Sequence, residues 1–102
     1  MSKATVKLIH PDFLAAFYFN ADAVAFAREL TQAGAYTELR TLDFPTLQGQ
    51  DAAEEVFDLS NNPGRYEERS ELYGQGRSLS VGDIVTVDGV DWLCCSMGWQ
   101  KL

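Results

Sequence analysis

Two stretches of the chain have the pattern of β-strands. Residues 3–9 are rich in β-branched side chains and alternate between faces, and His10-Pro11-Asp12 ends them. Residues 36–44 form a similar stretch that ends at Pro45. Residues 13–19 are apolar throughout, which fits a buried strand, but period alone does not separate such a run from a short helix. We place a third strand here and keep the helix as the alternative.

Helical spacing of apolar positions predicts a helix between the strands at 13–19 and 36–44. Asn20 offers the N-cap, Asp22 lies in the first turn near the positive end of the helix dipole, and Gly34 ends the helix. The apolar face is made by four residues, Ala23, Phe26, Ala27 and Leu30.

A second helix is predicted over about residues 51–59. Its buried side is formed by Ala52, Ala53, Val56, Phe57 and Leu59. Asn61-Asn62-Pro63-Gly64 stops this helix, and Pro63 can open a further short one after an asparagine cap. In that short helix Tyr66 and Tyr73 would face the core.

The last quarter of the chain predicts a β-hairpin with strands near 83–88 and 90–97. Asp88-Gly89 supplies the positive φ angles of a type I′ turn, and apolar residues flank it on both sides. One face of the hairpin would hold Val85, Val87, Val90, Trp92 and Cys94, and the other Ile84, Thr86, Asp91, Leu93, Cys95, Met97 and Trp99. Both faces are partly apolar, so each needs a cover, either a helix and a loop or a partner chain.

These elements predict one domain over residues 1–102, of the α+β class. We expect a small, mostly antiparallel sheet with two to three helices and the C-terminal hairpin. No apolar run is long enough for a transmembrane helix or a secretion signal, so the expected location is the cytoplasm, without membrane contact.

The net charge of −7 argues against direct binding of nucleic acid. Such binding depends on cations that meet phosphates, and eight Lys and Arg face fifteen Asp and Glu here. Arg65, Arg69 and Arg77 lie close in sequence and leave room for a local basic patch. Four carboxylates form a stripe on the predicted helix over 51–59, and three more follow in the next one. The full set is Asp51, Glu54, Glu55, Asp58, Glu67, Glu68 and Glu71.

No residue pattern points to an enzyme, a metal or a cofactor. The adjacent Cys94 and Cys95 would point to opposite faces of a strand and lack metal-ligand spacing, so we expect two small, buried, reduced side chains. His10 precedes a proline and reads as a turn residue rather than a catalytic base. The nucleophile elbow, the P-loop and the other common catalytic motifs are absent from the sequence.

Three segments together suggest a family. They are Glu55-Val56-Phe57-Asp58-Leu59-Ser60-Asn61, then Arg77-Ser78-Leu79-Ser80-Val81-Gly82-Asp83-Ile84-Val85, and finally Gly98-Trp99. This combination, over roughly residues 51–102, resembles the YodL-like domains, which are encoded on phages, plasmids and integrative elements of bacteria. The resemblance implies no catalytic residues. Read without the family, Gly82-Asp83 is a turn that aims the chain into the hairpin, with Ser78 or Ser80 bonded to nearby amides.

Two functions fit these observations. The first is an acidic phage or mobile-element protein that inhibits a host nucleic-acid-binding machine, of anti-CRISPR or anti-restriction type. The seven carboxylates would stand in for phosphates and bind a basic surface of a host protein or protein–nucleic-acid complex. The alternative is a structural or regulatory accessory module in replication or transfer of the element. It would be a homodimer through an apolar interface at Trp92, Met97 and Trp99.

Overall fold

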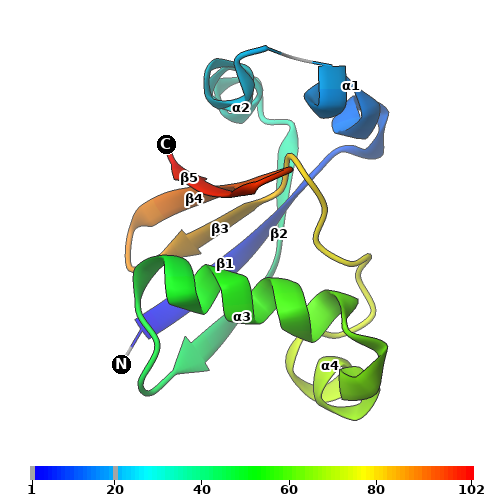
Figure 1. Ribbon diagram of the computed structural model, residues 1–102, viewed down its shortest axis with the longest axis vertical. Helices are drawn as coiled ribbons and strands as arrows, with labels where there is room; N and C mark the ends of the chain where they lie inside the picture. Colours follow the sequence, from blue (N-terminus) through cyan, green and yellow to red (C-terminus); the bar gives the residue numbers. More distant parts are fainter. Residues whose placement is uncertain (1, 20) are drawn as a thin grey trace.

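Five antiparallel strands form one sheet in the order β2-β1-β3-β4-β5 (Figure 1). The computed structural model describes residues 2–19 and 21–102. The strands are β1 (Ser2–Ile9), β2 (Tyr36–Phe44), β3 (Ile84–Val87), β4 (Val90–Cys95) and β5 (Gly98–Lys101). The helices are α1 (Leu14–Phe19), α2 (Ala23–Gln32), α3 (Gly49–Asn61) and α4 (Tyr66–Leu72), with 3-10 turns at Pro11–Phe13 and Pro63–Arg65. The α+β class and the mostly antiparallel sheet are therefore as predicted.

Helices cover both faces of the sheet and shield the apolar side chains on each. α3 packs on one face, where its buried residues meet alternate residues of the strands, such as Val85 and Val87 of β3. α1 and α2 cover one end of the opposite face, over Ile84 and Leu93 (Figure 1). The strand period of two sends neighbouring side chains to the two cores in turn.

The strand predicted at residues 13–19 is wrong and the helical alternative is confirmed, because Phe13 ends a 3-10 turn and residues 14–19 form α1. Pro11 opens a 3-10 turn, and the ring Nδ1 of His10 accepts a hydrogen bond from the amide of Asp12 at 3.2 Å, so the chain enters α1 already coiled. His10 is thus the turn residue that was expected. Phe17 alone is fully buried in α1, while Tyr18 and Phe19 are exposed, since this short helix covers only the end of the sheet.

The helix caps follow local chemistry. Asp22, predicted in the first turn, is itself the N-cap of α2, and its side chain accepts from the amide of Ala25 at 3.0 Å. The N-cap predicted at Asn20 lies outside the described residues. Gly34, at φ +74°, ends α2 as predicted, with the amide of Ala35 bonded to the carbonyl of Leu30. Asn62 caps the 3-10 turn that leads into α4.

Two expectations around α4 had different outcomes. Tyr73, just after the helix, is fully buried as predicted. Tyr66 is 69% exposed, so its predicted place in the core is wrong. It lies at the first position of a helix that leans on the end of α3 rather than on the sheet.

The Asp88-Gly89 turn forms as predicted, with φ +49° and +83°, and it pairs Val87 with Val90 and Val85 with Trp92. The predicted second strand is too long, however. β4 ends at Cys95, and the chain reverses at Ser96-Met97 before Gly98, whose φ is +117°.

The second reversal creates β5, a strand that was not predicted. Trp99 pairs with Cys94 and therefore faces α3 together with Trp92, not the opposite face as predicted. Met97 lies in the turn rather than on a strand face, and it is 97% exposed.

Replacing Gly82 with alanine is expected to destabilise the fold by roughly 2–4 kcal/mol, from a left-handed backbone and an overpacked core. Gly82 has φ +100°, and an added Cβ would lie 2.5 Å from the ring of Phe17. The matched control is Gly34→Ala, where φ is +74° but no described residue beyond its two chain neighbours lies within 4 Å of the added Cβ. Urea unfolding should show a cost of only about 1–2 kcal/mol for the control. Equal costs at the two glycines would contradict the close packing of Gly82 on Phe17.

Candidate acidic surface

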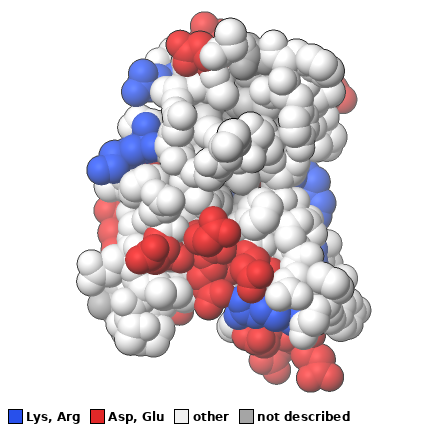
Figure 2. Space-filling view, viewed as in Figure 1, with Lys and Arg blue, Asp and Glu red and all other residues white. Residues whose placement is uncertain are grey.

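The predicted carboxylates gather on α3 and α4. Figure 2 shows a red group that crosses the molecule over α3 and a second one at the end that carries α4, with blue atoms between them. On α3, Asp51, Glu54 and Asp58 are exposed and Glu55 is half-buried, opposite the buried Val56 and Leu59. On α4, the exposed carboxylates are Glu67, Glu68 and Glu71. We call these seven residues the acidic face.

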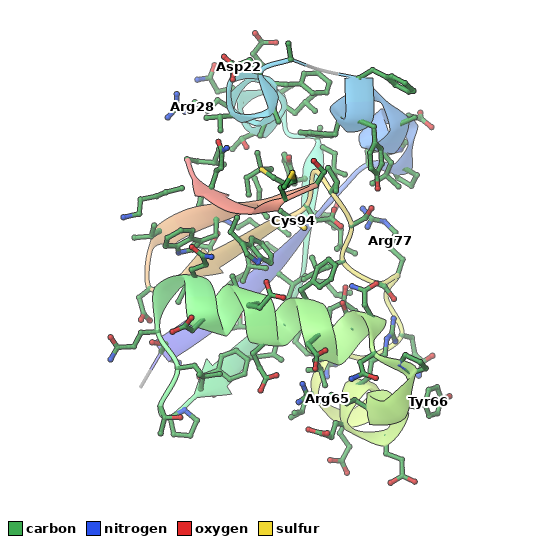
Figure 3. All side chains as sticks on the ribbon, viewed as in Figure 1. Asp22, Arg28, Arg65, Tyr66, Arg77 and Cys94 are labelled. Atoms are coloured by element: carbon green, nitrogen blue, oxygen red, sulfur yellow. The ribbon has the colours of Figure 1, made fainter. Side chains whose placement is uncertain are left out.

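Arg65 lies between α3 and α4 and binds three members of the acidic face (Figure 3). Its guanidinium donates to Glu55 and, at 2.9 Å, to Asp58 of α3, and it bonds Glu68 of α4 through two nitrogens at 3.1 and 3.0 Å. The pKa of Glu68 is lowered by this hydrogen bonding. The contribution of the pair to stability is therefore present above the ordinary pKa of glutamate and is lost as pH falls through the lowered value.

The remaining members of the acidic face are not neutralised. Within the described part of the chain, the carboxylates of Asp51, Glu67 and Glu71 have no ion pair or hydrogen-bond donor. Glu54 accepts a hydrogen bond at 2.7 Å from the indole nitrogen of Trp99, which leaves its charge in place. The acidic face thus keeps most of its negative charge.

The three residues predicted for an apolar interface, Trp92, Met97 and Trp99, differ in their exposure. Both tryptophans are half-buried and pack against the core under α3, and Trp99 also contacts the edge of Phe57. The indole nitrogen of Trp92 is buried without a hydrogen-bond partner among residues 2–19 and 21–102. Met97 is the member of the three that is open to solvent.

The motif segments that carry the family resemblance pack against each other. Ser60 and Asn61, at the end of α3, bond the loop before β3: the side chain of Asn61 donates to the carbonyl of Leu79 at 3.0 Å, and the amide of Leu79 donates to the Ser60 hydroxyl at 3.1 Å. The hydroxyl of Ser78 donates to the carbonyl of Ser60 at 2.7 Å. These residues therefore join the helix to the hairpin.

Asp83 is the centre of the same region and is fully buried. Its carboxylate receives two hydrogen bonds from the guanidinium of Arg77, at 2.6 and 2.8 Å, and one each from the amides of Ile9 and Ser80, at 2.8 Å. Arg77 also donates to the carbonyl of Ile9. Gly82-Asp83 is thus the structural corner that its residue types indicated, but Arg77 and Ile9 as partners could not be read from the sequence.

Arg65, Arg69 and Arg77, which lie close in sequence, do not form a basic patch. Arg65 and Arg77 bind carboxylates, as described above. Arg69 donates to backbone carbonyls of Ser60, Gly74 and Gly76. All three cations are used to hold the structure together.

The two cysteines are free and face opposite sides of β4. Burial raises the pKa of the Cys94 thiol to about 12 and also raises the pKa of the half-buried Cys95. Among the described residues, no group of three or more metal-ligating side chains comes together, and no described helix has the length and hydropathy to span a bilayer.

Alkylation of Cys94 with iodoacetamide at pH 8 is expected to be slow in the folded protein. A pKa of about 12 leaves thiolate on the order of one part in ten thousand at that pH, against a substantial fraction in the unfolded chain. Mass spectrometry with and without urea measures the rates at each cysteine. Labelling of Cys94 at the same rate in both conditions would contradict its burial.

No family model matches the chain, and comparison with curated proteins and with solved structures finds no match.

Proposed function

We propose that this chain is a non-enzymatic binding protein whose acidic face occupies a basic surface of a nucleic-acid-binding machine. The observation that supports it is the concentration of charge. Residues 49–72 contain seven carboxylates and two arginines, a net charge of −5 out of −7 for the whole chain. Opposite charge steers association and favours partners that carry a positive surface.

The spacing of the carboxylates supports mimicry of a nucleic-acid strand. From Asp51 to Asp58, α3 rises about 10 Å and carries four carboxylates, or roughly one charge per 3 Å of axis. One strand of duplex DNA carries one phosphate charge per about 3.4 Å of axis. A groove that binds a phosphate backbone is therefore matched in linear charge density by one face of α3.

Arg65 limits this charge, so its removal should strengthen binding. The variant Arg65→Ala is expected to bind a basic partner about two- to fivefold more tightly at low salt, because one repulsive cation leaves the acidic face. Urea unfolding of the variant is measured alongside, because the Arg65 side chain is only 21% exposed and its three ion pairs join α3 to α4. Titration with a deca-lysine peptide measures the change. Weaker binding would mean that Arg65 is needed to hold the carboxylates in place.

The proposed context is a phage or mobile element and the cytoplasm of its bacterial host, with a CRISPR effector or a restriction enzyme as the target class. Its support is the resemblance of the motif segments to the YodL-like domains. Because Ser60, Asn61 and Asp83 serve the fold, the resemblance concerns the scaffold, and the support for the acidic face is its charge.

Affinity capture from a bacterial lysate tests the proposal. The immobilised protein is expected to retain nucleic-acid-binding proteins that are released by salt and by added duplex DNA. The variant Asp51→Lys, Glu54→Lys, Glu55→Lys, Asp58→Lys should retain none of them. Retention of the same proteins by that variant would contradict the role of the acidic face.

The alternative, a homodimeric accessory module joined through the hairpin, has less support. Trp92 and Trp99 already pack under α3, which leaves little apolar area on the hairpin for a second copy.

A further inference from the structure

A hollow of about 310 Å³ separates α3 from the β4–β5 turn. Glu54 and Phe57 of α3 line one side, and residues 94–99 line the other. Cys94 of β4, labelled in Figure 3, lies on the side of the sheet that faces α3 and lines the hollow. Glu54 lines the hollow and is also a member of the acidic face, so the hollow opens directly onto that face.

The lining combines aromatic surface with one fixed carboxylate. The rings of Phe57 and Trp99 meet edge to face, with their centroids 6.4 Å apart. The indole nitrogen of Trp99 holds one carboxylate oxygen of Glu54 at 2.7 Å. Met97 stands at the rim, almost completely exposed, and its flexible thioether is suited to close over an apolar stem.

A carboxylate beside aromatic rings favours a cation with a flat face. A guanidinium can stack on a ring and bond a carboxylate at the same time, whereas a lysine ammonium is a compact and more strongly hydrated charge. Within the part of the chain that the structure describes, no lysine or arginine lines the hollow, so this cation is left to a partner.

We propose that the hollow between α3 and the β4–β5 turn receives an arginine side chain of the partner protein. This inference rests on the proposed function, since it names the side chain through which a basic surface would dock. It makes the acidic face and the β4–β5 turn one composite surface, with Glu54 as the shared residue.

The two indole N–H signals give a direct test by ¹⁵N NMR, because the chain contains only two tryptophans. The protein of residues 1–102 is titrated with a deca-arginine peptide and, separately, with deca-lysine. The Trp99 signal is expected to shift and saturate with deca-arginine, and the signal of the Trp92 indole N–H, which is buried, should stay in place. Deca-arginine should bind several-fold more tightly than deca-lysine.

Matched variants separate the hollow from general charge. Glu54→Gln is expected to weaken deca-arginine binding about tenfold, as for a charged hydrogen bond. Glu67→Gln removes the same charge from α4 and should weaken binding less than about threefold. Met97→Ala should weaken deca-arginine and leave deca-lysine nearly unchanged.

Two results would overturn the inference in different ways. If amides of α3 and α4 shift while Trp99 does not, and if both glutamine variants lose affinity equally, the hollow is not the site and the acidic face still binds cations. If no signal shifts with either peptide at low salt, the proposed function fails as well.

Discussion

Replacing Asp83 with alanine is expected to lower the free energy of unfolding by about 3–5 kcal/mol, the usual cost of breaking a buried ion pair. The substitution leaves the guanidinium of Arg77 without its carboxylate and the amides of Ile9 and Ser80 without their acceptor. Two segments are joined at this point, namely the end of β1 and the loop before β3. Urea unfolding followed by circular dichroism measures the loss.

A double variant supplies the control for Asp83. Arg77→Met combined with Asp83→Leu removes both charges, and it should be more stable than Asp83→Ala because no charge is left unpaired. A cost below about 1 kcal/mol for Asp83→Ala, within the range of an ordinary surface substitution, would contradict the role of the buried pair.

Reversing the four carboxylates of α3 is expected to abolish binding to a basic partner while the fold persists. The changes Asp51→Lys, Glu54→Lys, Glu55→Lys and Asp58→Lys take the net charge from −7 to +1, by eight units. The variant loses the Arg65 pairs with Glu55 and Asp58 but keeps the pair with Glu68, and the buried face of α3 is unchanged. Circular dichroism checks the fold, and titration against a captured partner measures binding.

The matched control reverses four exposed carboxylates elsewhere, at Asp12, Glu29, Glu38 and Asp43. It changes the net charge by the same amount and leaves α3 and α4 intact. It should reduce the association rate moderately and keep the complex. Equal loss in both variants would mean that net charge, and not the acidic face, decides binding.

Local signals predicted most of the fold. The strand at 36–44 has the predicted bounds, and the Asp88-Gly89 turn fixed the register of β3 and β4, because turn chemistry acts over a few residues. The failures came from tertiary context. The run at 13–19 has no period and is helical because of the turn at Pro11, and β5 exists through its pairing with β4.

In the acidic face, too, local spacing was predictable and contacts between distant residues were not. Helical spacing placed Asp51, Glu54 and Asp58 on one exposed face, as the period of 3.6 requires. The partners of the carboxylates lie on other elements: Arg65 comes from beyond the break at Pro63, and Trp99 comes from a strand that was not predicted. The pattern of residues along the chain does not show which distant arginine or tryptophan will bond a carboxylate of a helix.

Displacement of DNA tests the central claim most directly. A captured nucleic-acid-binding partner is loaded with fluorescent duplex DNA, and anisotropy is followed as this protein is added. We predict that the DNA is released stoichiometrically, that release weakens steeply as salt is raised, and that the variant with four lysines on α3 releases none. A complex in which the partner holds the DNA and this protein together would contradict nucleic-acid mimicry by the acidic face.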